Sequence, residues 1–170
     1  MREIDIKDRE YDIFHMFNDQ WALSTSGESV EDYNTMTIGW GSLGTIWGGP
    51  HKGRSIATIY VTPARYTWEY LEKNDTFTIS FFPEEYRKDL LYLGSHSGRE
   101  GDKVSQTSLT PMECGPGVAF EEAELILVCK KIYSDAFQLE KTPEDIREGI
   151  YTRMPPHHFY IGEIVKALVP

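Results

Sequence analysis

The stretch Asn34-Thr35-Met36-Thr37-Ile38-Gly39-Trp40 decides the fold. Hydroxyl-bearing or small residues at positions 35, 37 and 39 alternate with apolar residues at 36, 38 and 40, and this period of two predicts a β-strand. The polar side carries hydroxyl groups and no charge, which suits a wall for a flat polar ligand. Taken alone, the stretch favours a simpler alternative, an edge strand in which Thr serves β-propensity.

The length and charge of the chain limit its class. The 170 residues suffice for one domain with a hydrophobic core, which we place at 1–170. The net charge of −10 argues against a nucleic-acid partner, because phosphate backbones are bound by basic surfaces. We expect a cytoplasmic protein with no membrane partner, because no stretch is long and apolar enough to cross a bilayer and the start shows no signal sequence.

The sequence predicts neither a metal site nor a catalytic side chain. The five His are scattered, and His157 and His158 are adjacent instead of four residues apart, so no zinc-like spacing is present. Cys114 and Cys129 form no CxxC pair, and Cys129 lies in an apolar run where we expect it to be buried.

Strand-like segments recur along the rest of the chain, at 21–25, 56–61, 76–82, 124–133 and 158–169, with a bulge expected at Gly162. We expect 21–25 to pair with the opening stretch. Helices are predicted over 8–17 with Tyr11 and Phe14 facing inward, within 64–73, from Pro83 to Gly94, and over 143–148. The remaining segments are predicted to be a turn at 26–27, a Gly-rich loop at 41–54 and an irregular region at 104–118. About six short strands with inserted helices favour a closed antiparallel barrel, so the fold class is mainly β.

Two loops are candidates for binding one anion. Arg65 and Thr67 lie where a helix begins, with its start at Pro63 or at Thr67 left open. A start at Thr67 would bring a guanidinium, a hydroxyl and free amides together. The second loop, 94–103, is rich in Gly and Ser, so its amides could form an anion-binding nest. The alternatives are that Arg65 is an ordinary surface residue and that 94–103 only connects two elements.

These segments also carry a resemblance to a known family. The stretch 34–40 resembles the NxMTIxW signature strand of the flavin reductase-like family, the FMN-binding split barrels that include flavoredoxins. The similarity continues in order through 21–25, 65–67, 77–83, 95–99, 102–103, 121–125 and 160–164. Each motif is short, but the ordered set covers nearly the whole chain.

The resemblance implies a six-stranded antiparallel Greek-key split barrel that forms a homodimer with FMN near the interface. By position, the residues that would contact the isoalloxazine ring are Asn34, Thr35, Met36 and Thr37. Those whose backbone would contact the ring or the ribityl chain are Thr58, Ile59, Tyr60 and Val61. The phosphate would be held by Arg65 and Thr67, and its contacts completed by Ser97, Gly98 and Lys103. The space over the ring would be shaped by Trp40 and Trp47.

The resemblance further implies a redox role, with NAD(P)H or a partner redox protein as electron donor. The first hypothesis is an FMN-dependent NAD(P)H oxidoreductase of the flavin reductase type. The second is a flavoredoxin-like carrier that binds FMN and takes electrons from a partner, and the third is a barrel that has lost its flavin. The segments 50–55 and 134–156 resemble the family least, and we expect them to form the substrate side.

Overall fold

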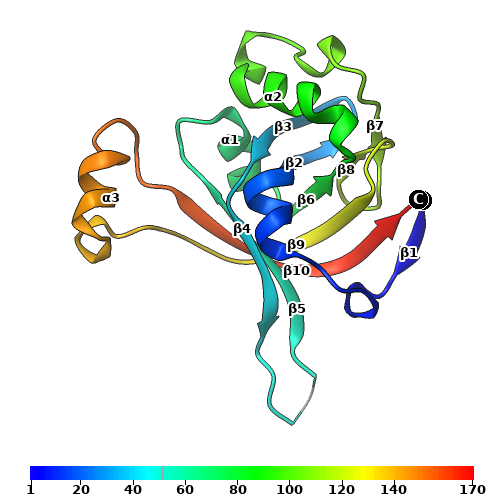
Figure 1. The fold of residues 1–170 in the computed structure, drawn as a ribbon, viewed down its shortest axis with the longest axis horizontal. Coiled ribbons are helices and arrows are strands. Elements are labelled where there is room, and N and C mark those ends of the chain that lie inside the picture. The colour runs from blue at the N-terminus through cyan, green and yellow to red at the C-terminus, as the bar shows by residue number, and fades with distance from the viewer. Residues whose placement is uncertain (51) are drawn as a thin grey trace.

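The computed structural model describes residues 1–50 and 52–170, and it is dominated by antiparallel strands (Figure 1). The strands are β1 (Arg2–Ile4), β2 (Ala22–Ser29), β3 (Asp32–Ile38), β4 (Gly41–Ile46), β5 (Arg54–Val61), β6 (Thr76–Phe81), β7 (Pro111–Glu113), β8 (Val118–Phe120), β9 (Leu125–Ala136) and β10 (His158–Val169). The α-helices are α1 (Tyr66–Lys73), α2 (Arg87–Ser95) and α3 (Glu144–Gly149). This composition confirms the mainly β fold class.

The larger sheet has eight strands among the described residues, two more than the sequence predicted. Its order is β3-β2-β6-β9-β10-β5-β4, and β1 also pairs with β10. The expected pairing of the opening stretch with 21–25 is confirmed, since β2 and β3 are antiparallel neighbours with Thr25 opposite Thr35. The bulge is confirmed as well, because the register between β9 and β10 shifts between Ile161 and Gly162. At that position a Cβ would lie 2.6 Å from Cζ of Phe77, so the strand needs Gly there.

Two hydrophobic clusters bury the apolar side chains of the sheet. One cluster contains β5, β6 and β9 side chains, such as Ile59, Phe77 and Leu127, together with Phe17. The other lies beneath α2 and the small sheet β7-β8, with Leu90, Leu93 and Phe120 among its members. Cys129 is fully buried in the first cluster, as the sequence predicted.

The N-terminal segment differs from the predicted helix over 8–17. It forms a 3₁₀-helix at Ile6–Asp8, which is capped by the side chain of Asp5, and a π-helix at His15–Gln20. Phe14 was expected to face inward but is 88% exposed, whereas Met16 and Phe17 are buried. A π-helix has a wider turn than an α-helix, so the side chains that meet the core differ from those that a spacing of 3.6 residues selects.

The Gly-rich segment 41–54 contains a strand where the sequence predicted only a loop. β4 pairs with β5 from Gly41 opposite Ile59 to Ile46 opposite Arg54. Gly41 lies against the ring of Phe17, where a Cβ would come within 2.2 Å, and at Gly44 a Cβ would meet no atom within 4 Å. Glycine is therefore required at 41 by close packing, and its presence does not prevent backbone pairing.

The bounds of several other elements differ from those that the sequence predicted. Gly27 is inside β2 and pairs with Tyr33, so the predicted turn at 26–27 is wrong and the connection to β3 follows Ser29. The irregular region at 104–118 includes a 3₁₀-helix at Val104–Gln106 and the strand β7. The helix after Pro83 begins as a 3₁₀-helix at Glu84–Tyr86 and continues as α2. Helix α1 starts at Tyr66, between the two predicted starts, and Arg65 is its N-cap residue.

Two elements project from the body of the molecule. The β4-β5 hairpin extends away from the sheet on one side, and a long connection between β9 and β10 carries α3 on another (Figure 1). We call residues 137–157 the arm. No helix among residues 1–50 and 52–170 is long and apolar enough to cross a membrane.

Candidate functional site

Two adjoining cavities lie along β3 and share the side chains of Met36 and Arg65. The first, of about 130 Å³, is formed by β3, the start of α1, the end of α2 and the loop 96–103. We call it the anion cavity. The second, of about 330 Å³, is formed by β3, β5 and the arm, and its wall includes Trp40, Tyr60 and His157. We call it the aromatic cavity.

Asn34, on β3, contacts two other elements around the anion cavity, the helix α1 and the loop that contains Gly98. Its side-chain amide nitrogen donates to the hydroxyl oxygen of Thr67 at 2.6 Å, which joins β3 to the first turn of α1. Gly98 packs so tightly against the same side chain that a Cβ would lie 2.1 Å from its Oδ1 atom. Asn34 and Thr67 are both buried, so this contact fixes the cavity floor.

Arg65 lies at the N-terminus of α1, where first-turn amides lack intrahelical acceptors. Its own backbone amide donates to the carbonyl of Thr62, which closes the turn before the helix. Ser97 caps a short 3₁₀-helix at Gly98–Glu100 by accepting from the amide of Arg99. These caps hold both predicted anion-binding loops against one cavity.

Lys103 is the second cation of the anion cavity and is only 7% exposed. Its ammonium group donates to the carbonyls of Leu93 at 2.8 Å and His96 at 2.9 Å, which fixes its position. Burial, and then the nearby positive charge of Arg65, lowers the pKa of Lys103 to about 8. Within the described part of the chain, neither cation forms an ion pair. A bound anion would relieve this repulsion.

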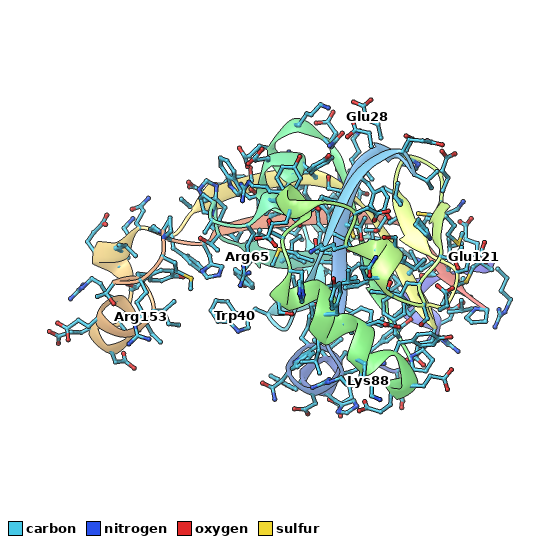
Figure 2. The ribbon with its side chains drawn as sticks, turned by 90° about the horizontal axis from the view of Figure 1, so that it is seen from above. Glu28, Trp40, Arg65, Lys88, Glu121 and Arg153 are labelled. Carbon is cyan, nitrogen blue, oxygen red and sulfur yellow. The ribbon has the colours of Figure 1, made fainter. Side chains whose placement is uncertain are left out.

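The aromatic cavity is mostly apolar and has few hydrogen-bonding groups. Its apolar wall is formed by Met36, Ile38, Trp40, Tyr60, Ile150 and Met154. The two threonines that line it are already engaged as donors, because Thr37 donates to the carbonyl of Leu90 and Thr62 to that of Pro155. Figure 2 shows Trp40 and Arg65 on the side of the body that faces the arm.

His157 lines the aromatic cavity, and no sequence motif predicted this position. Its ring lies 4.7 Å from that of Trp40, and its Nδ1 atom is 3.2 Å from the hydroxyl of Tyr151. Burial, together with the nearby Arg65 charge, lowers the pKa of His157. In the sequence, His157 is one of two adjacent His residues without metal-ligand spacing, and only the fold brings it to Trp40.

The structure brings together part of the predicted site. The predicted residues that line one of the two cavities are Asn34, Met36, Thr37, Tyr60, Arg65, Thr67, Ser97, Gly98 and Lys103. The other four residues line neither cavity. The Thr35 hydroxyl is 2.7 Å from that of Thr25, and Thr58, Ile59 and Val61, whose backbone was predicted to contact the ligand, are buried in β5.

The two segments expected on the substrate side are placed differently. The arm supplies Ile150, Met154 and His157 to the aromatic cavity. In the segment 50–55, His51 lies outside the described residues. Lys52 to Ser55 line a separate cavity of about 640 Å³ beside β10, in which Arg54 pairs with Glu163. Trp47 is exposed and lines neither cavity of the site.

Comparison with solved structures identifies the fold. A flavoredoxin from Methanosarcina acetivorans superposes with a TM-score of 0.66 at 21% identity, covering 100% of this chain and 76% of that one. A candidate flavin reductase with a split barrel domain from Shewanella frigidimarina gives a TM-score of 0.66 at 16% identity, with 98% and 75% covered. A Streptomyces globisporus NADH:FAD oxidoreductase, in complex with NAD and FAD fragments, gives 0.62 at 16%, with 89% and 74% covered.

These likenesses show that the chain has the split-barrel fold of flavin reductase-like and flavoredoxin structures. The predicted split-barrel fold is therefore confirmed, although no pairing between β3 and β4 closes the large sheet within the described residues. No protein-family model and no curated protein sequence matches the chain.

Proposed function

We propose that this protein is an FMN-binding oxidoreductase that passes electrons from NAD(P)H through the flavin to an acceptor. One observation carries the proposal: a small cavity with two cations adjoins a larger, mostly apolar cavity lined by aromatic side chains, and the two share Met36 and Arg65. A phosphate attached to a planar ring system needs this combination. The neighbouring structures, which include an FMN-binding protein and an NADH:FAD oxidoreductase, support the same assignment.

The residues of the anion cavity fit a phosphate. Arg65 offers a planar guanidinium, Lys103 a fixed ammonium group, and the first turn of α1 free amides. The close approach of Gly98 to Asn34 leaves the loop backbone near the cavity, where a side chain would fill the space. We assign the phosphate to Arg65, Thr67, Ser97, Gly98 and Lys103.

The ring would lie along the cavity-facing side of β3, at Asn34, Met36 and Thr37, with Tyr60 opposite. A bound flavin supplies the redox chemistry, and the protein supplies position, electrostatics and access. Met36 and Ile38 exclude water from that face, while the Thr37 hydroxyl, bonded to the Leu90 carbonyl, holds α2 against the strand. We assign no side chain of β3 a catalytic role, and we propose a homodimer with the flavin near the subunit interface.

A flavoredoxin-like electron carrier is the second candidate function. The likeness to flavoredoxin structures from Methanosarcina acetivorans and Desulfovibrio vulgaris supports it, since the fold also occurs in proteins of that name. Such a carrier would bind FMN but would take electrons from a partner redox protein. Stopped-flow reduction of the FMN-loaded protein by NADH, NADPH and dithionite separates the two, because the carrier would react only with dithionite.

The phosphate assignment is tested by the double substitution Arg65→Ala with Lys103→Ala. Charge-assisted hydrogen bonds contribute about 1.5–3 kcal/mol each, so FMN affinity should fall on the order of 100-fold or more. Riboflavin lacks the phosphate, and its affinity should change little. The matched control is Lys52→Ala with Arg54→Ala, which removes the same charges on the hairpin. Equal losses for FMN and riboflavin would overturn the assignment, and absence of FMN binding by the unmodified protein would overturn the proposed function.

A further inference from the structure

The side chain of Arg99 joins two of the segments that form the anion cavity, 63–73 and 96–103. Its Nη1 atom donates to the carbonyl of Ala64 at 3.3 Å, and its Nη2 atom donates to Oε1 of Glu69 at 2.5 Å. Within the described part of the chain, both hydrogen bonds between these two segments come from this one side chain. The guanidinium also lies over the ring of Tyr66, at 5.0 Å from the ring centre.

Residues 97–102 form a loop that is closed at its base, and we call this loop the flap. At the base, the buried ammonium group of Lys103 donates to the carbonyl of His96 at 2.9 Å. This bond fixes the two residues that flank the flap. Near its end, Gly101 has a φ of +134°, a conformation in which the absence of a side chain gives the backbone freedom to turn.

The contacts of the flap with the rest of the anion cavity differ in burial. Gly98 packs against the buried side chain of Asn34. The ion pair of Arg99 with Glu69 lies on the surface instead, and these side chains are 44% and 50% exposed. Exposed ion pairs are weak and are screened by salt, so the Arg99 contacts should open more readily than the buried ones.

The charges of the pair allow its role to be separated from a direct effect on a phosphate. Neither Arg99 nor Glu69 lines the anion cavity. If they acted on a bound phosphate by charge alone, the cation would hold it and the carboxylate would repel it. If they act by joining the flap to α1, both side chains are needed.

We propose that Arg99 is a latch that holds the flap against α1, and that FMN enters and leaves the anion cavity when this latch opens. The inference names a regulation of the proposed site and rests on the proposed function. With the latch closed, the flap keeps Ser97 and Gly98 beside the phosphate. Arg99 and Glu69 are positioning residues, and raised ionic strength hastens exchange because it weakens their pair.

The test measures FMN release from Arg99→Gln and Glu69→Gln, which change the charge in opposite directions. Release is timed by chasing isotopically labelled FMN on the protein with an excess of unlabelled FMN. Loss of an exposed ion pair should speed release about two- to fivefold in Glu69→Gln. Arg99→Gln also loses the ring contact and the Ala64 bond, so its release should be about tenfold faster.

Three comparisons show whether the two side chains act as one latch. The double substitution should release FMN no faster than Arg99→Gln alone, because partners in one contact are not additive. Raising NaCl from about 0.05 M to about 0.5 M should speed release more in the original protein than in Arg99→Gln. Riboflavin, which has no phosphate for the flap to cover, should leave every variant at the original rate.

The matched control is Lys73→Gln, which breaks the exposed pair with Asp32 at the other end of α1 and should leave the FMN release rate unchanged. Melting temperatures monitor the fold of each variant. Faster release in Arg99→Gln with slower release in Glu69→Gln would overturn the latch, because Arg99 would then act on the phosphate by its charge.

Original release rates in both variants would overturn the latch as well, while intact FMN binding would leave the proposed function standing. If the unmodified protein binds no FMN, the proposed function itself fails. The two failures are therefore distinguished by the FMN affinity of the unmodified protein, which is measured first.

Discussion

Substitution of Gly98 by Ala should damage the anion cavity without removing any charge. The added Cβ would lie 2.1 Å from Oδ1 of Asn34 and 3.0 Å from Cδ1 of Tyr66. Because Cβ atoms do not approach other heavy atoms closer than 3.0 Å, the loop or the Asn34 side chain must move by about 0.9 Å. Asn34 cannot rotate away freely, since its amide nitrogen is bonded to Thr67 at 2.6 Å.

The loss of folding stability in Gly98→Ala can be estimated from these contacts. Overpacking of a buried position costs about 1–3 kcal/mol, and loss of the Asn34–Thr67 hydrogen bond adds about 1 kcal/mol. For a chain of this size, 1 kcal/mol lowers the melting temperature by about 2–4 °C, so Gly98→Ala should melt about 4–16 °C lower. FMN affinity should fall about tenfold or more, because the loop backbone leaves the phosphate.

Thermal unfolding and FMN titration of the purified variant measure both effects. Gly44→Ala is the matched control, because a Cβ at that position meets no atom within 4 Å, and its stability should stay within about 1 kcal/mol of the original. A Gly98→Ala protein with the original melting temperature and FMN affinity would show that the loop and Asn34 do not pack as described here.

Two further predictions concern charge and packing. Lys103 has a pKa of about 8, and in the proposed site its protonated form would bind the phosphate. FMN affinity should therefore be full below that pH and fall by up to about tenfold per pH unit above it. The check is to measure the ratio of FMN affinity to riboflavin affinity between pH 6.5 and 9.5. If this ratio falls with pH equally steeply in Lys103→Gln, the prediction is refuted. Gly162→Ala should destabilise the protein by about 1–3 kcal/mol in urea unfolding, because its Cβ would lie 2.6 Å from Phe77 and 2.7 Å from Cβ of Cys129. An unfolding free energy unchanged by this substitution would contradict the tight packing at the bulge.

The elements predicted correctly are those whose sequence signals lie within a few neighbouring residues. The alternation in 34–40 predicted β3, although the strand ends at Ile38 and Trp40 lies beyond it, in the wall of the aromatic cavity. Arg65 before a helix was predicted because a helix N-terminus has a short sequence signature. Such signals lie within a few residues of one another, so they can be recognised without the fold.

The missed features depend on contacts between distant segments. The strand β4 was predicted as a loop because of its glycines, yet one of them is required by the ring of Phe17, which comes from the N-terminal π-helix. His157 meets Trp40 across more than a hundred residues of sequence. Thr35 was assigned to the ring by its position in the resembling strand, and its hydroxyl lies 2.7 Å from that of Thr25 on β2. Pairings of this kind need the sheet order, which no local pattern provides.

The anion cavity is held more rigidly by hydrogen bonds than the aromatic cavity. This difference affects which substitutions can change the ligand specificity of the site. The anion cavity is fixed by buried, hydrogen-bonded groups such as Asn34 and Lys103. The far wall of the aromatic cavity comes from the arm, whose helix α3 has no buried residue and which is joined to the body through its two ends. Substitutions at Ile150 or Met154 can therefore reshape the ligand space without disturbing the phosphate contacts. Under the proposed function, the arm would determine which molecule the site accepts, while β3 and the two loops would hold the cofactor.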